Sequence, residues 1–268
     1  MRIILWIGNE ENQKALANKI ASRYSIIGIV TEARIHKSRF VFNKVIEKVI
    51  ERIFIPSIGR AWWGMKKYYE AKFTKYPNVE LLNVENINSE KAFDFTKKLN
   101  PDLILVSGTR LIKEKMLSIK PKVGILNLHT GLSPYIKGGP NCTNWCIATK
   151  QFHLIGNTIM WIDSGIDSGN IVTTAFTNID SSDNLLNIHI KVMEHAHSLY
   201  LNAIDFLNKG YMSNVKQSEI AKGKIYYTKK WTLKEKFLLV KNLKLYRKIL
   251  ESNKIEEYKK GMRIVKID

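Results

Sequence analysis

The chain has 268 residues, 45% of them apolar, and a formal net charge of +19. This length can hold one large domain, or a domain of about 200 residues followed by a tail. No apolar run reaches the roughly 18–20 residues of a membrane-spanning helix, and the first residues lack the small-residue cleavage site of a signal peptide, so a cytoplasmic protein is predicted.

The charge excess is concentrated in two segments, residues 34–76 and 222–268, and the chain between them is close to neutral. Basic charge of this kind predicts attraction to polyanions such as nucleotide phosphates, nucleic acid or an anionic membrane surface. Solvated basic helices without any partner are the alternative explanation.

The N-terminal part predicts a β-α-β unit. Arg2–Gly8 and Ile26–Thr31 are β-branched, apolar runs typical of buried parallel strands, and Gln13–Tyr24 between them has helical spacing. The expected fold is therefore α/β, with a doubly wound, mostly parallel sheet. A single glycine, Gly8, follows the first strand, so the glycine-rich fingerprint of a dinucleotide site is missing.

Residues 37–76 predict a basic helical hairpin inserted between elements of the sheet. Apolar residues recur at helical spacing from Phe40 to Phe54, Pro56–Gly59 interrupts the pattern, and an aromatic-rich stretch follows as far as Phe73. A helical layer packed on the domain is the favoured interpretation. A helix lying on a membrane surface, or a contact between two copies, are the alternatives.

The rest of the chain continues to alternate between strands and helices. The expected strands are Val79–Val84, Leu103–Gly108, Val123–Leu128, Thr158–Ile162 and Ile171–Phe176. The expected helices are Ser89–Leu99 with Ser89 as its N-cap, a short one within Thr109–Ile119, Thr143–Lys150 and Asp183–Lys209. Residues 211–268 are predicted to form a basic, mainly helical C-terminal extension.

Three polar residues stand where strands end. Asn127 and His129 leave one face of the same strand, and Asp167 lies in the glycine-containing loop Asp163–Gly169 after a later strand. A carboxamide can donate to a developing oxyanion, a histidine can accept a proton near neutral pH, and an aspartate can hold the resulting imidazolium. This set suits acyl transfer to an amine without a covalent enzyme intermediate. A capped strand end with a satisfied histidine is the alternative.

Several spaced motifs resemble the signature of the folate-dependent formyltransferases. They are Asn127-Leu-His129, then Leu132-x-Pro134 with Lys137-Gly138, then Asp163-x-Gly-x-Asp167-x-Gly169. That family includes methionyl-tRNA, glycinamide ribonucleotide and sugar N-formyltransferases. The resemblance implies a Rossmann-like formyltransferase domain over residues 1–210, with 37–76 as an insertion and 211–268 as an extension.

The resemblance also implies the roles of individual residues. Asn127, His129 and Asp167 match the catalytic triad of the family, in which the amine attacks the formyl carbon, Asn127 stabilises the oxyanion, His129 is the base or electrostatic partner and Asp167 orients it. The formyl donor is 10-formyltetrahydrofolate and no metal is expected. The residues implied in binding this donor are Gly108, Thr109, Arg110, Leu111, Ile112, Ile162, Asp163 and Ile166. The residues expected to bind the acceptor are Asn9, Tyr135, Lys137 and Gly138.

The acceptor is predicted to be a nucleotide-linked amino sugar, as in polysaccharide biosynthesis, and no nucleic acid is expected. Thr130-Gly131 replaces the usual Pro-Ser of the family in a loop that faces the acceptor in relatives. The segment after Gly210 has helical periodicity, unlike the barrel-like C-terminal domain of the methionyl-tRNA enzymes. The base of the nucleotide could stack on one of four aromatic residues, Trp62, Trp63, Tyr68 or Tyr69.

Several alternatives stay open at this point. The acceptor could instead be methionyl-tRNA or glycinamide ribonucleotide, although glycinamide ribonucleotide enzymes usually stop near the position of Gly210 and lack the basic insertion. A non-catalytic relative that binds RNA or membrane is a different class of protein. Peripheral membrane contact through the basic segments, and a homodimer, are also left open. Cys142 and Cys146, four residues apart, are predicted to be core or pocket-wall residues.

Overall fold

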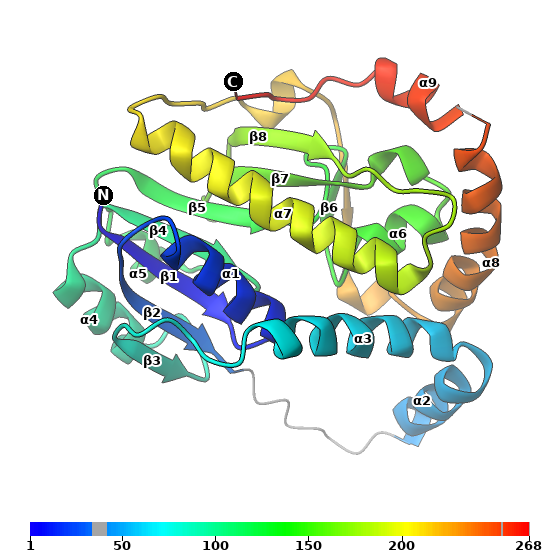
Figure 1. The fold of residues 1–268 in the computed structure, drawn as a ribbon, viewed down its shortest axis with the longest axis horizontal. Helices are drawn as coiled ribbons and strands as arrows, with labels where there is room; N and C mark the ends of the chain where they lie inside the picture. The colour runs from blue at the N-terminus through cyan, green and yellow to red at the C-terminus, as the bar shows by residue number, and fades with distance from the viewer. Residues whose placement is uncertain (34–41, 253, 268) are drawn as a thin grey trace.

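The computed structural model describes residues 1–33, 42–252 and 254–267 (Figure 1). A seven-stranded sheet with the order β3-β2-β1-β4-β5-β7-β8 lies at its centre. The strands are β1 (Ile3–Gly8), β2 (Ile26–Glu32), β3 (Leu81–Val84), β4 (Leu103–Ser107), β5 (Gly124–His129), β7 (Gly156–Trp161) and β8 (Ile171–Phe176). The first five strands pair in parallel, whereas β7 and β8 are antiparallel to their neighbours. The expected doubly wound, mostly parallel α/β sheet is confirmed.

Helices cover both faces of this sheet (Figure 1). On one face, α1 (Glu11–Ala21) and α7 (Leu185–Asn208) pack against Ile3, Leu5 and Ile7 of β1. On the other face, α4 (Glu90–Leu99) and α5 (Glu114–Leu117) pack in the cluster that contains Ile4 and Trp6. Because alternate residues of β1 enter opposite cores, the strand is apolar throughout, which explains the run seen in the sequence. None of the described helices is long and apolar enough to cross a membrane.

The predicted helical hairpin is present as α2 (Phe42–Phe54) and α3 (Pro56–Lys72), and the start of the predicted segment, residues 37–41, lies outside the described residues. Pro56 occupies the first turn of α3, where its missing N–H has no helical partner to lose. Ala61, Met65 and Tyr69 of α3 are buried, and α3 packs against α1 and α7. The helical layer predicted for this segment is therefore α3, while α2 extends away from the sheet (Figure 1).

The C-terminal extension packs against the rest of the domain at several points. It contains β9 (Lys224–Tyr226), α8 (Leu233–Leu250) and α9 (Lys254–Lys260). β9 pairs in parallel with β6 (Ile136–Gly138), and α8 packs against α6 (Cys142–Ala148). The mainly helical character of the extension is confirmed, but the β6–β9 pair was not foreseen. It brings the extension beside the loop that follows His129.

Candidate active site

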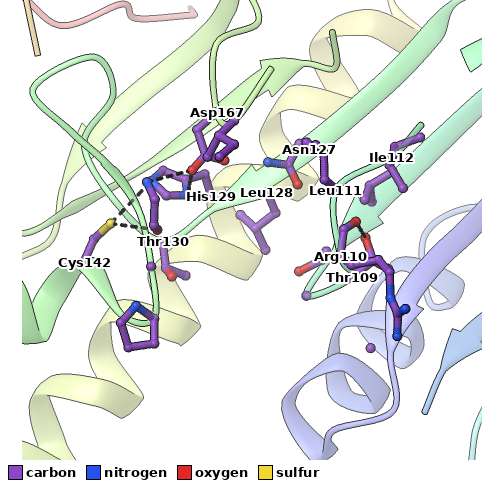
Figure 2. A pocket seen from close by; sticks show the side chains of 18 of the residues that line it. Thr109, Arg110, Leu111, Ile112, Asn127, Leu128, His129, Thr130, Cys142 and Asp167 are labelled. Atoms are coloured by element: carbon purple, nitrogen blue, oxygen red, sulfur yellow. Dashed lines mark hydrogen bonds and ion pairs between the residues drawn. The ribbon is translucent and has the colours of Figure 1, made fainter. Parts of the chain in front are cut away.

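A cavity of about 760 Å³ opens at the carboxyl ends of the parallel strands (Figure 2). Gly8, Ser107 and His129, which end or follow β1, β4 and β5, all line it. This edge of an open α/β sheet is where ligands of such folds usually bind. The cavity is therefore the candidate active site, and it contains all three residues that the sequence singled out.

Asn127, His129 and Asp167 converge in this cavity. Asn127 and His129 come from the same face of β5, and Figure 2 shows the Asn127 carboxamide turned toward the other two residues. The His129 ring is 8% exposed, and its Nδ1 atom lies 3.4 Å from Oδ2 of Asp167. The same Oδ2 atom accepts a hydrogen bond of 2.9 Å from the backbone N–H of Gly138. The arrangement brings together a carboxamide, an imidazole and a carboxylate, which is the set needed to manage charge and a proton at one carbon.

Tyr200 of α7 fixes the strand that carries Asn127 and His129. Its buried hydroxyl donates to the carbonyl oxygen of Leu126 at 2.9 Å and accepts from the backbone N–H of Val106 at 3.0 Å. Burial raises the pKa of Tyr200 well above its usual value, so the hydroxyl keeps its proton. The hydroxyl thus bridges β4 and β5 directly before the point where their side chains enter the cavity.

The loop that carries Asp167 is held by short-range and long-range contacts. Asp167 has a φ of 47°, in the left-handed region that non-glycine residues adopt at a cost. Oδ1 of Asp163 accepts hydrogen bonds from the Gly165 N–H at 3.0 Å and the Ser168 hydroxyl at 2.6 Å. Gln217 of the extension donates from Nε2 to the carbonyl oxygen of Asp167 at 2.8 Å. Sequence reasoning missed Gln217, because nothing local marks a residue fifty positions away.

Cys142 contacts the opposite side of the His129 ring. Its Sγ atom lies 3.6 Å from Nε2 of His129 and 3.5 Å from the carbonyl oxygen of Gly138 (Figure 2). Burial raises the pKa of the Cys142 thiol well above its usual value, so the S–H proton is retained. A Cβ at Gly131 would lie 2.4 Å from Nε2 of His129 and 2.9 Å from the Cys142 Sγ, so glycine is required there. The crowding around His129 thus explains why glycine stands at position 131, where the family usually has serine.

The residues expected to bind the donor form one wall of the cavity. Gly108, Thr109, Arg110, Leu111, Ile112, Ile162, Asp163 and Ile166 all line it. Glu32 holds Arg110 in place through two contacts. The buried Glu32 carboxylate lies 2.6 Å from Nε of Arg110 and accepts a hydrogen bond of 2.8 Å from the backbone N–H of Arg110. Glu32 was missed, although an acidic residue that closes a buried apolar strand is a usable signal.

Two of the four residues expected to bind the acceptor line the cavity. Asn9 and Gly138 line the cavity, but Tyr135 and Lys137 do not, and the Tyr135 hydroxyl instead bonds to the main chain of Arg263. Residues from other segments also line the cavity. They are Trp62 of α3, Cys142 of α6, and Tyr226, Tyr227 and Thr228 of the extension.

The basic segments contribute little charge to the cavity. Among its described lining residues, Arg110 is the one Lys or Arg side chain, whereas Glu10, Glu32, Asp163 and Asp167 are acidic. Within the described ranges no group of three or more His, Cys, Asp and Glu side chains is placed to hold a metal ion. Almost all of the lysine and arginine side chains in the described part of the chain therefore lie outside the candidate active site.

Comparison with known proteins places the site in a family. Residues 64–204 match the family model described as formyl transferase. A methionyl-tRNA formyltransferase of Clostridium tetani is 30% identical over 143 residues, which are 53% of this chain and 46% of that protein. The chain thus spans about half the length of curated relatives of this kind.

Solved structures share the fold at low identity. A sugar N-formyltransferase from a Shewanella species is 17% identical, covers 91% of this chain and 88% of its own, and has a TM-score of 0.58. The N-formyltransferase of Helicobacter canadensis, in complex with folinic acid and dTDP-3-aminofucose, is 14% identical, covers 91% and 81%, and has a TM-score of 0.54. Because the family model covers more than half of the chain, including the whole candidate triad, the chain belongs to the formyl transferase family.

Proposed function

We propose that this protein transfers a formyl group from 10-formyltetrahydrofolate to the primary amine of a nucleotide-linked amino sugar. The observation that carries the proposal is the convergence of Asn127, His129 and Asp167 in one cavity, with Nδ1 of His129 3.4 Å from Asp167. The cavity volume of about 760 Å³ lies in the upper part of the range of small-molecule ligand pockets.

The three residues divide the chemistry of the proposed transfer. When the acceptor nitrogen forms its bond to the formyl carbon, negative charge develops on the formyl oxygen, and the Asn127 carboxamide donates to that oxygen. His129 takes the proton that the attacking amine loses, and Asp167 stabilises the imidazolium. The bond between the formyl carbon and the donor nitrogen then breaks, and the proton passes to that nitrogen. No covalent bond to the protein is needed.

The donor wall has the character that a flat pterin ring requires. Leu111 and Ile166 line the cavity and are 49% and 44% exposed, so two apolar side chains are available to cover a ring. Main-chain groups of the segment from Gly108 to Ile112 supply polar partners, and the Glu32–Arg110 ion pair keeps that segment in position. Such a preformed wall reduces the entropy lost when a ligand binds.

We assign to the acceptor the part of the cavity lining, called the acceptor wall, that contains two exposed aromatic side chains, Trp62 of α3 and Tyr227 of the extension. A planar nucleobase can stack on such rings. Of the other aromatic residues suggested by the sequence, Tyr69 is fully buried and Trp63 does not line the cavity. Neutral groups such as the Thr228 hydroxyl and the Asn9 amide are left to bind the phosphates.

Methionyl-tRNA is the second candidate acceptor. Curated relatives that match the chain by sequence are methionyl-tRNA formyltransferases, and the basic composition suits a polyanion. The amino sugar is favoured because lysines are absent from the described cavity lining and the extension, with α8 packed on α6, supplies aromatic groups to the cavity wall.

Mass spectrometry can test the proposal with competing acceptors. The protein is incubated with 10-formyltetrahydrofolate and, in separate reactions, nucleotide-linked 3- and 4-amino sugars, methionyl-tRNA and glycinamide ribonucleotide. Formylation of an amino sugar, absent with a folded His129→Ala variant, is expected. Formylation of methionyl-tRNA or glycinamide ribonucleotide alone would overturn the choice of acceptor, and no transfer to any amine would overturn the activity.

A further inference from the structure

The outer helix of the hairpin, α2, presents an apolar face that no part of the described chain covers. We propose that α2 is an interfacial helix that docks the protein on an anionic lipid bilayer. The exposed apolar side chains are Val45, Ile46, Val49, Ile53 and Phe54, of which Ile53 and Phe54 are 64% and 66% exposed. None of them belongs to any of the apolar cores of the described chain. Contiguous exposed apolar surface of this kind marks a binding site.

The spacing of these residues makes α2 two-sided. Ile46, Val49 and Ile53 recur every three or four residues and so lie along one side of the helix. Charged residues of both signs occupy the intervening positions, where Lys48 and Arg52 are basic and Glu47 and Glu51 are acidic. An apolar side that enters the acyl region, with basic side chains at the level of the headgroups, is the pattern of helices that lie in the plane of a membrane surface.

Contacts with α3 and α8 hold α2 in position. Its neighbour α3 is anchored through Ala61, Met65 and Tyr69, and Lys236 of α8 forms an ion pair with Glu51 of α2. The exposed Trp63 lies in the middle of α3 and is an aromatic side chain of the kind enriched at membrane interfaces. α2 lies at the edge of the molecule (Figure 1), and its apolar side chains are exposed there.

The second observation is a row of lysines on α8, the helix that the Lys236–Glu51 ion pair joins to α2. The row has a spacing of three or four residues, so its members share one side of the helix. Its exposed lysines are Lys234, Lys241, Lys244 and Lys248, and the exposed Phe237 occupies the remaining position of the row. These lysines do not line the active-site cavity, so the proposed chemistry leaves them without a role. Anionic headgroups complement such a row of charges.

A bilayer explains both features better than the other candidate occupants do. RNA would neutralise the lysines of α8 but would leave the aliphatic side chains of α2 in water. A second copy could cover the apolar side, but each copy carries a net charge of +19 and would repel the other. An anionic bilayer offers negative charge and an apolar interior at the same surface, and this inference does not depend on the proposed reaction.

Co-sedimentation with vesicles tests the inference on the full chain. The wild type is expected to bind vesicles of phosphatidylcholine and phosphatidylglycerol at low salt, and to bind phosphatidylcholine vesicles weakly. The double variant Ile53→Glu/Phe54→Glu should lose at least tenfold in affinity without a change in thermal unfolding. The control Met212→Glu/Tyr258→Glu changes two similarly exposed side chains elsewhere and should retain binding.

A charge variant and two further measurements complete the test. Lys241→Glu/Lys244→Glu should weaken binding to anionic vesicles and reduce its salt dependence. The inference is overturned if the wild type does not bind anionic vesicles or if Ile53→Glu/Phe54→Glu binds as well as the wild type. A dimer in light scattering that Ile53→Glu/Phe54→Glu dissociates, without vesicle binding, would assign the face to a second copy. If the protein binds RNA through these lysines without needing Ile53 and Phe54, and does not bind vesicles, the lysine row would be assigned to RNA.

Discussion

Gln217 donates hydrogen bonds from Nε2 to the carbonyl oxygens of Asp167 and Gly169, both at 2.8 Å. The two acceptors belong to the loop that carries the candidate catalytic carboxylate, and the donor belongs to the C-terminal extension. Because Asp167 has a positive φ, contacts from outside the loop are needed to hold it in this conformation. The extension thus acts on the candidate active site through the backbone of Asp167.

Replacing Gln217 should impair formyl transfer. Gln217→Ala removes both donors, each worth about 1 kcal/mol, so the Asp167 loop should sample other conformations and kcat should fall about tenfold. The KM for the acceptor should change less. Asn242→Ala is the matched control, because it removes a buried amide donor to the carbonyl oxygen of Ala148, which does not line the cavity. Equal losses in kcat for the two variants would contradict a specific role for Gln217.

A methyl group at Gly131 should displace His129. In Gly131→Ala the new Cβ would meet Nε2 of His129 at 2.4 Å and the Cys142 Sγ at 2.9 Å, so the ring must leave its present position in the cavity. Formyl transfer is expected to fall by about a hundredfold, as for a misplacement of about 1 Å. Gly59→Ala in α3, where no atom lies within 4 Å of the new Cβ, should leave activity intact and raise the free energy of unfolding by about 1 kcal/mol. Full activity of Gly131→Ala would contradict the claim that a Cβ at position 131 displaces His129.

The buried histidine His189 should make the protein less stable in acid. Its Nε2 atom donates to Oδ1 of Asn144 at 2.9 Å, and burial lowers its pKa to about 4 from a usual 6.5. Between pH 6.5 and 4 the unfolded chain binds a proton that the folded chain does not, so stability falls as pH falls through this window, by at most about 3 kcal/mol. Above pH 6.5 this contribution is fully present.

Urea unfolding at pH 7.5 and pH 5 measures this effect. The His189→Gln variant, whose side chain is uncharged at both pH values, should lose less stability between them than the wild type. His153→Gln is the control, because His153 is only partly buried. An unchanged difference between the two pH values in His189→Gln would assign the acid sensitivity to other groups, among them His195 and His197, whose pKa values burial also lowers.

The aromatic residues of the acceptor wall should affect the acceptor and not the donor. Trp62→Ala or Tyr227→Ala removes a stacking surface, which should raise the KM for the amino sugar about tenfold while the KM for 10-formyltetrahydrofolate stays constant. Trp63→Ala, which removes an aromatic side chain outside the cavity, should change neither KM. Parallel increases in both KM values would contradict the assignment of this wall to the acceptor.

Local patterns in the sequence were sufficient for most of the fold. The apolar runs of β1 and β4, the Ser89 cap and the long amphipathic repeat of α7 all depend on neighbouring residues, so they can be recognised without the structure. The family motifs identified the three residues of the candidate triad, which the structure brings into one cavity, for the same reason. Each motif keeps its spacing within a few residues.

The parts that the sequence did not predict depend on distant pairing. β6 and β9 are three residues each, too short for a periodic signal, and they pair across a long stretch of chain. That pairing places Tyr227 in the cavity wall, while Tyr135 turns to Arg263. Gln217 and Glu32 likewise act on segments far from them in sequence, so neither contact could be inferred from spacing.

The most direct test of the account is the mass of the product formed from a nucleotide-linked amino sugar and 10-formyltetrahydrofolate. The account predicts a sugar heavier by one formyl group with the wild type, and no such product with folded Asn127→Ala, His129→Ala or Asp167→Ala variants. An unmodified sugar with the wild type, together with formylated methionyl-tRNA under the same conditions, would contradict it.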